Sequence, residues 1–161
     1  MNAREPHVGM LRHPVHFLSL GFGSGLAPKA PGTFGTVAAI PVYLALANTS
    51  SEIFIGVTIL LFLIGIYLCG VTAKTLGVHD HSAIVWDEIV GFLVTMAFVK
   101  CSLLSVFLGF LLFRLFDILK PWPIAWFDKQ VHGGLGIMLD DLIAALFSAA
   151  ILAYIEYLSY I

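Results

Sequence analysis

Residues 53–70 read IFIGVTILLFLIGIYLCG and contain no charged side chain. An apolar run of this length reaches the roughly 17 to 25 residues that an α-helix needs to cross a bilayer. The rest of the chain has the same character, because 60% of its 161 residues are hydrophobic and only 11% are charged. A soluble fold of this size cannot bury that much apolar surface, so we expect a membrane protein.

Outward from this segment, other apolar stretches predict helices near residues 33–48, 86–99, 103–117 and 141–160. The helices near 86–99 and 103–117 are short for simple spans, so they either cross with a tilt or with polar flanks, or pair as a hairpin that dips into the bilayer. The predicted fold class is all-α, a polytopic membrane helical bundle with about four to five membrane helices, some of them short or re-entrant. No tandem repeat divides the chain, and we expect residues 1–161 to form a single membrane-embedded domain, with residues 1–20 mobile or lying along the membrane surface.

Charge is distributed unevenly between the two ends of such a bundle. If all five helices cross, the N-terminal segment and the loops 71–85 and 118–140 share one face. That face carries most of the basic residues: Arg4, Arg12, Lys29, Lys74, Arg114, Lys120 and Lys129. The positive-inside rule predicts that it is the cytoplasmic face, and most carboxylates, including Asp128, share it. A net charge of -2 and a pI near 6.3 argue against a broad electrostatic grip on nucleic acid.

Glycine and proline are concentrated before the first predicted span, where residues 21–36 read GFGSGLAPKAPGTFGT. Glycines allow backbone N–H groups to converge on an anion, and the start of the following helix adds a favourable partial charge. We therefore expect a phosphate site formed by Ser24, Gly25, Lys29, Thr33 and Thr36. The alternative is a plain turn in which Thr33 caps the helix. The segment is not a nucleotide P-loop, because Lys29 is not followed by Ser or Thr.

Adjacent acids, Asp87 and Glu88, open the apolar stretch that follows the sequence HDHS at 79–82. Neighbouring positions on a helix point about 100° apart, so this pair can bind one metal ion only together with ligands from other segments. The alternative is two solvated acids at a helix N-terminus, where the helix dipole favours them. His79 and His81 are weak metal-ligand candidates, because two histidines in a loop carry little evidence on their own.

Three more acids stand at the ends of the later helices. Asp117 lies three residues after Arg114 and three before Lys120, so a metal-binding carboxylate would stand between two cations that hold phosphate oxygens. The alternative is a salt bridge with basic side chains that snorkel to the headgroups, which explains Arg114 better than Asp117. Asp140 and Asp141 come at the expected start of the last helix, where a cap needs only one of them, so the other is better explained as a ligand.

Carboxylates that arrive from three helix ends on one face predict a magnesium site, because Mg²⁺ prefers oxygen ligands. The candidate metal ligands and catalytic residues are Asp87, Glu88, Asp117, Asp140 and Asp141, with Arg114 and Lys120 as further phosphate contacts. Such a site suits a phosphate monoester, which a metal-bound water or a carboxylate would attack. A cysteine phosphatase is excluded, because no arginine follows either cysteine at the required spacing, and the Asp-x-Asp pair of the aspartyl-phosphate enzymes is absent from the sequence.

Four segments together carry a resemblance to a known family: GSGLAPKAPGT at 23–33, IVWDE at 84–88, FRLFDILKPWPI at 113–124 and GGLGIMLDD at 133–141. In this order they resemble phosphatidylglycerophosphatase A. The resemblance implies Mg²⁺-dependent removal of the phosphate monoester from phosphatidylglycerophosphate, giving phosphatidylglycerol, in the bacterial inner membrane. It places the family's acidic positions on the five acids above. The resemblance also implies that Lys120 and the loop 23–36 contact the phosphate. The expected partners are the phosphatidylglycerophosphate substrate and the membrane.

Two other classes of protein remain as alternatives. A transporter or channel can also carry intramembrane acids, but it would place them within its spans and show inverted repeats. A membrane scaffold without catalytic activity would leave the glycine-rich segments and the acid pairs unexplained.

Overall fold

The described part of the chain consists of helices and the turns that connect them. The structure, a computed structural model, describes residues 5–159, and for residues 127–129 it describes only the backbone. In chain order the elements are η1 (Val8–Arg12), α1 (Pro14–Ser19), η2 (Gly21–Leu26), α2 (Pro31–Leu46), α3 (Ser51–Leu76), α4 (Trp86–Met96), α5 (Leu103–Leu119), α6 (Ile124–Gln130) and α7 (Gly133–Leu158), where η marks a 3-10 helix. The all-α prediction is confirmed, since the described residues contain no strand.

Local signals in the sequence set the ends of the long helices. Ser50 caps α3 by accepting a hydrogen bond from the Ile53 N–H at 3.4 Å, and Ser102 caps α5 by accepting one from the Ser105 N–H at 3.0 Å. At its other end α3 stops at Gly77, whose φ of 76° is a left-handed conformation that glycine adopts at no steric cost. These residues divide a nearly continuous apolar sequence into helices of defined length.

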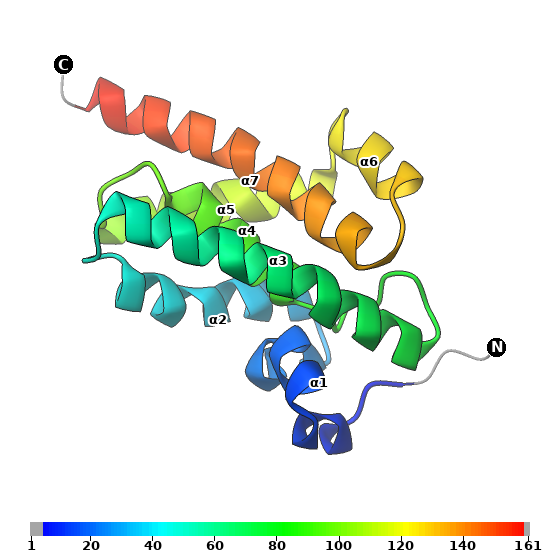
Figure 1. Cartoon of the computed structure of the whole chain (residues 1–161). Helices are drawn as coiled ribbons and strands as arrows, with labels where there is room; N and C mark the ends of the chain where they lie inside the picture. Colours follow the sequence, from blue (N-terminus) through cyan, green and yellow to red (C-terminus); the bar gives the residue numbers. More distant parts are fainter. Residues whose placement is uncertain (1–4, 160–161) are drawn as a thin grey trace.

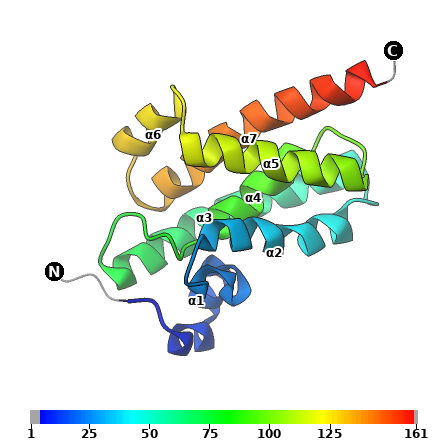
Figure 2. The same ribbon diagram turned by 180° about the vertical axis from the view of Figure 1, so that it is seen from behind.

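The short helix α4 lies at the centre of the bundle. It packs against α2, α3, α5 and α7, which surround it in both views (Figures 1 and 2). Of its residues Trp86–Met96, all but Val94 are buried, and Phe92 and Leu93 have no exposed surface. The helix expected near 86–99 is therefore shorter than predicted and is enclosed by the other helices.

Successive long helices run in opposite directions, so the helix ends that carry the candidate acids lie together at one end of the bundle. The helices α2, α4 and α7 begin there, α3 and α5 end there, and α6 lies beside them (Figures 1 and 2). Acids that are far apart in the sequence are thereby brought to neighbouring helix ends. Of the residues expected on this face, Arg4 and the side chains of Asp128 and Lys129 lie outside the described part of the chain.

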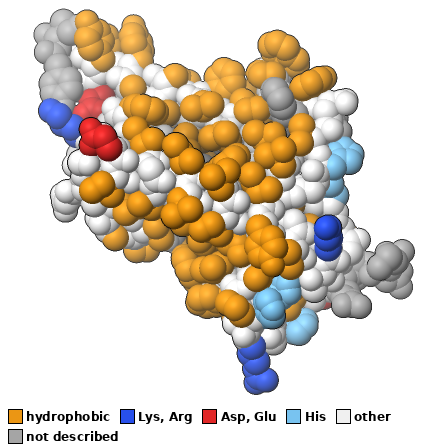
Figure 3. All heavy atoms as spheres, viewed as in Figure 1, with side chains coloured by type: hydrophobic (Ala, Val, Ile, Leu, Met, Phe, Trp, Pro, Cys, Tyr) orange, Lys and Arg blue, Asp and Glu red, His pale blue; other side chains and the backbone are white. Residues whose placement is uncertain are grey.

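Long apolar surfaces remain exposed on the outside of the bundle. Both α3 and α7 are 26 residues long and apolar enough to cross a membrane, and only 28% of the most apolar window of α3 is buried. On α3 the side chains of Ile59, Leu60, Leu63 and Tyr67 are more than half exposed. Figure 3 shows hydrophobic side chains across the middle of this face, with charged and histidine side chains toward its ends. The core helix of a soluble protein would bury such residues, so the pattern favours a bundle surrounded by lipid.

The last helix begins earlier than its sequence suggested. We expected it near residues 141–160 with Asp140 or Asp141 as a cap, but α7 begins at Gly133, and His132 is its N-cap residue. That expectation was wrong because the glycines before the acids resemble a turn. In the structure the first turns of α7 pack against α3 and α6, and such contacts outweigh the weak helix propensity of glycine.

Candidate active site

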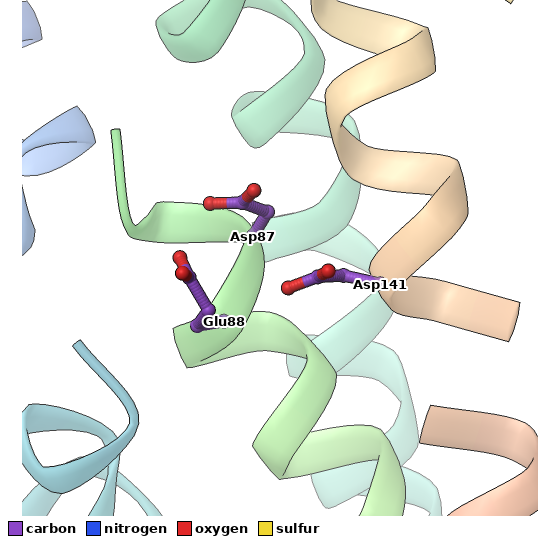
Figure 4. A group of neighbouring side chains, drawn as sticks. All are labelled: Asp87, Glu88 and Asp141. Atoms are coloured by element: carbon purple, nitrogen blue, oxygen red, sulfur yellow. The ribbon is translucent and has the colours of Figure 1, made fainter. Parts of the chain in front are cut away.

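Three carboxylates from two helices meet inside the bundle. Asp87 and Glu88 lie in the first turn of α4, and Asp141 lies in α7 more than two turns after its start. Their side chains surround a common space (Figure 4), and one oxygen of each carboxylate lies within 4.8 Å of those of the other two. The three residues meet because α4 packs along α7. We call Asp87, Glu88 and Asp141 the acid cluster.

The acid cluster is buried, and some of its oxygens have no hydrogen-bond partner. Asp87, Glu88 and Asp141 are 8%, 9% and 3% exposed. Among the described residues, no group donates a hydrogen bond to Asp87 Oδ1, Glu88 Oε2 or Asp141 Oδ2. Carboxylates at this spacing repel one another when ionised, and a buried charge without a partner is strongly destabilising. All the atoms that could bind a metal ion here are carboxylate oxygens, so the acid cluster fits a hard divalent cation such as Mg²⁺.

Arg114 and Asp117, near the end of α5, border the acid cluster. The Nη1 atom of Arg114 lies 3.6 Å from Glu88 Oε1, and the same guanidinium pairs with Asp117 one turn later. Asp117 in turn lies close enough to Asp141 to interact with it. The Nε–H of Arg114 is buried and has no acceptor among the described residues. Arg114 is thus held by two carboxylates and keeps a donor for a further acceptor, such as a phosphate oxygen.

Lys120 and Asp140 form a second ion pair at the edge of the acid cluster. The chain leaves α5 at Lys120, whose φ of 40° is a left-handed conformation that is uncommon outside glycine. In this conformation the ammonium group of Lys120 reaches Asp140 on α7, which is 4% exposed. Two cations therefore stand beside the acid cluster, one from within α5 and one from its end.

The structure divides the five predicted metal ligands into two groups. Asp87, Glu88 and Asp141 form the acid cluster, and Glu88 also contacts Arg114, whereas Asp117 and Asp140 lie outside the cluster and are each paired with a cation. The assignment of Asp117 and Asp140 as metal ligands stays a prediction.

The glycine-rich segment packs against the residues that lead into the acid pair. Ser24 Oγ donates a hydrogen bond to the carbonyl of Gly21 at 2.8 Å. Gly25 lies against the carbonyl of Ala83, where a Cβ atom would come within 2.0 Å of the oxygen. The segment therefore helps to hold the start of α4 in place, and phosphate binding by Ser24 and Gly25 stays a prediction.

The other predicted phosphate contacts lie around the start of α2. Because α2 begins at Pro31, Thr33 lies within its first turn and is not its cap, which corrects the alternative drawn from the sequence. Thr36 is fully buried and donates a hydrogen bond to the carbonyl of Gly32 at 3.0 Å, while Lys29 is exposed in the preceding turn. Phosphate binding by Lys29, Thr33 and Thr36 stays a prediction.

Two contacts near the acid cluster were not anticipated from the sequence. The indole N–H of Trp86 donates to the carbonyl of Leu61 at 3.1 Å, which fixes the first residue of α4 against α3. His79 Nε2 accepts a hydrogen bond from the Gly133 N–H at 2.9 Å, which joins the loop after α3 to the start of α7. The position of Trp86 directly before the two acids is the local signal that could have indicated a role for it. No spacing in the sequence relates His79 to Gly133.

Proteins with similar sequences carry related names. The family model for phosphatidylglycerophosphatase A matches residues 17–156. The chain is 49% identical to Phosphatidylglycerophosphatase A of Escherichia coli, over 90% of the chain and 85% of that protein. It is 46% identical to the protein of the same name from Haemophilus influenzae, over 91% of each. A Bacteroides thetaiotaomicron protein, provisionally named a phosphatidylinositol-3-phosphatase, is 33% identical over 84% of the chain and 89% of its own length. No solved structure matches the chain.

Proposed function

Because the chain belongs to the phosphatidylglycerophosphatase A family, we propose that it is a Mg²⁺-dependent lipid phosphatase. Its substrate would be phosphatidylglycerophosphate and its product phosphatidylglycerol, a step of phospholipid biosynthesis. The observation that carries this proposal is the acid cluster, in which one buried oxygen of each carboxylate has no hydrogen-bond partner among the described residues and which lies beside two cations.

In the proposed reaction one set of residues binds the metal ion and another binds the phosphate. Asp87, Glu88 and Asp141 would hold Mg²⁺, which when bound neutralises phosphate charge and polarises phosphorus. Arg114 and Lys120 bind the non-bridging phosphate oxygens through charge-assisted hydrogen bonds.

Hydrolysis then breaks the bond between phosphorus and the glycerol oxygen. A water molecule or a carboxylate attacks phosphorus, the departing oxygen takes up a proton, and the lipid leaves as an alcohol. In the carboxylate route a water then hydrolyses the phosphorylated residue, so both routes end in inorganic phosphate. Asp117 and Asp140 lie at the edge of the site, where a carboxylate can accept the proton that the attacking water loses.

The lipid substrate approaches from the bilayer in this proposal. Its acyl chains stay beside the exposed apolar faces of the helices, and its phosphate enters the end of the bundle where the acid cluster lies. Arg12 ends η1, Lys29 precedes α2 and Lys74 lies near the end of α3, toward that end of the bundle (Figure 1), so the positive-inside rule makes it the cytoplasmic side of a bacterial inner membrane.

Release of inorganic phosphate from phosphatidylglycerophosphate in detergent micelles tests the proposal. The purified chain should need Mg²⁺ and lose activity in EDTA, and Asp87→Asn should lower kcat by about 100-fold or more, the scale for losing a group that stabilises the transition state. Glu52→Gln is the matched control, because Glu52 is exposed at the far end of α3. Full activity of Asp87→Asn would refute the site. Faster release from phosphatidylinositol 3-phosphate would refute the substrate.

A further inference from the structure

The first turn of α2 touches the acid cluster and Arg114 at a glycine. A Cβ atom on Gly32 would lie 2.1 Å from Glu88 Oε1 and 3.0 and 3.1 Å from the two Nη atoms of Arg114. Real Cβ atoms essentially never show contacts below 3.0 Å. The ends of the Glu88 and Arg114 side chains therefore occupy the volume that any other residue at position 32 would fill.

We infer that Gly32 is a positioning residue of the active site, where the absence of a side chain allows the Glu88 carboxylate and the Arg114 guanidinium to meet against α2. This inference rests on the proposed function, in which Glu88 binds the metal ion and Arg114 binds the phosphate. Gly32 lies within the loop 23–36 that we expected to bind phosphate, and the inference gives it a different role, which is to leave room for the side chains of Glu88 and Arg114.

The surroundings of Gly32 differ in kind from those of a glycine that serves only the fold. A Cβ on Gly134 would lie 1.8 Å from the backbone oxygen of Ile66, so two helices would have to move apart. At Gly32 the obstructing atoms are the ends of two flexible side chains, which can rotate to other conformers. Alanine at position 32 is therefore compatible with the fold but displaces Glu88 and Arg114.

The displacement is large on the scale of a metal site. Glu88 Oε1 would have to retreat from 2.1 Å to beyond 3.0 Å from the new methyl group, while the oxygens of the acid cluster now lie within 4.8 Å of one another. Changes around metal ligands typically cost about 10- to 100-fold in metal affinity. Gly32→Ala should therefore weaken metal binding by at least about tenfold.

A titration with Mn²⁺ in place of Mg²⁺, followed by electron paramagnetic resonance on the purified full-length chain in detergent, measures this directly. The matched control is Gly56→Ala, because Gly56 also lies in a helix and a Cβ there would meet nothing within 4 Å. Both variants replace a helical glycine by alanine, which has the higher helix propensity. We expect the Mn²⁺ dissociation constant to rise at least about tenfold in Gly32→Ala and to stay unchanged in Gly56→Ala, with both proteins folded.

A double-mutant cycle separates positioning from a general structural effect. In a Glu88→Ala background the main obstructing side chain is gone, so Gly32→Ala should add little further loss of Mn²⁺ affinity. Wild-type affinity in Gly32→Ala, an unfolded Gly32→Ala protein, or an equal loss in the Glu88→Ala background would each overturn the inference alone. A wild-type chain that neither binds Mn²⁺ nor releases phosphate would instead refute the proposed function, and the inference with it.

Discussion

Replacing Asp141 by asparagine should stabilise the metal-free protein, although it removes a residue of the active site. The three carboxylates of the acid cluster are buried, with one oxygen of each within 4.8 Å of the others. Without a bound cation, their mutual repulsion opposes folding. Asparagine has nearly the shape of aspartate and carries no charge, so the repulsion falls while the packing is kept.

The geometry sets the size of this effect. Two unit charges 4.8 Å apart interact by about 3.5 kcal/mol at an effective dielectric constant of about 20, and Asp141 has two such neighbours. Arg114 beside Glu88 offsets part of the repulsion, and uptake of protons relieves more. We therefore expect Asp141→Asn to add about 1 to 3 kcal/mol at pH 8 in EDTA. For a chain of this length that raises the unfolding temperature by roughly 2 to 4 °C per kcal/mol.

Thermal unfolding in EDTA and in Mg²⁺ provides the assay. A bound ion stabilises the wild-type protein by about 4.1 kcal/mol at a thousand times its dissociation constant, whereas Asp141→Asn should gain much less. The order of the two unfolding temperatures should therefore reverse when Mg²⁺ is added. Glu52→Gln, which removes an exposed carboxylate at the other end of the bundle, should behave like the wild type in both buffers. An Asp141→Asn protein that is less stable than the wild type in EDTA at pH 8 would refute the reasoning.

Three further predictions follow from other contacts. Lys120→Met should lower kcat/KM for phosphatidylglycerophosphate by about 10- to 100-fold, because a hydrogen bond to a charged group contributes about 1.5–3 kcal/mol. An unchanged kcat/KM would show that Lys120 does not bind the phosphate. In intact cells a membrane-impermeant maleimide should label the exposed Cys101 from outside and leave the buried Cys69 unmodified. Labelling of Cys101 only after permeabilisation would reverse the proposed orientation. Trp86→Phe should lower the free energy of unfolding by about 1 kcal/mol through loss of the hydrogen bond to Leu61, a loss measurable by thermal unfolding in Mg²⁺ and contradicted by an unchanged midpoint.

The helical fold and its apolar character could be predicted because they depend on neighbouring residues in the chain. Residues 53–70 are apolar over a spanning length, and they fall inside α3, which Ser50 caps and Gly77 ends. Asp87 and Asp141 were recognised as candidates because each belongs to a pair of adjacent acids at the expected start of an apolar helix, and a helix cap needs only one of two aspartates. None of these signals depends on how the helices pack.

Which acids form the acid cluster depends on how the helices pack against one another. Asp117 and Asp140 are the same residue type as Asp87 and Asp141, yet they lie outside the acid cluster and each is paired with a cation. The role of Gly32 likewise emerges only from the side chains of Glu88 and Arg114, which belong to two other helices. Distances between groups on different helices depend on how far each helix is rotated about its axis and shifted along its neighbours. Close packing between residues far apart in the chain sets both quantities, and no local pattern records them.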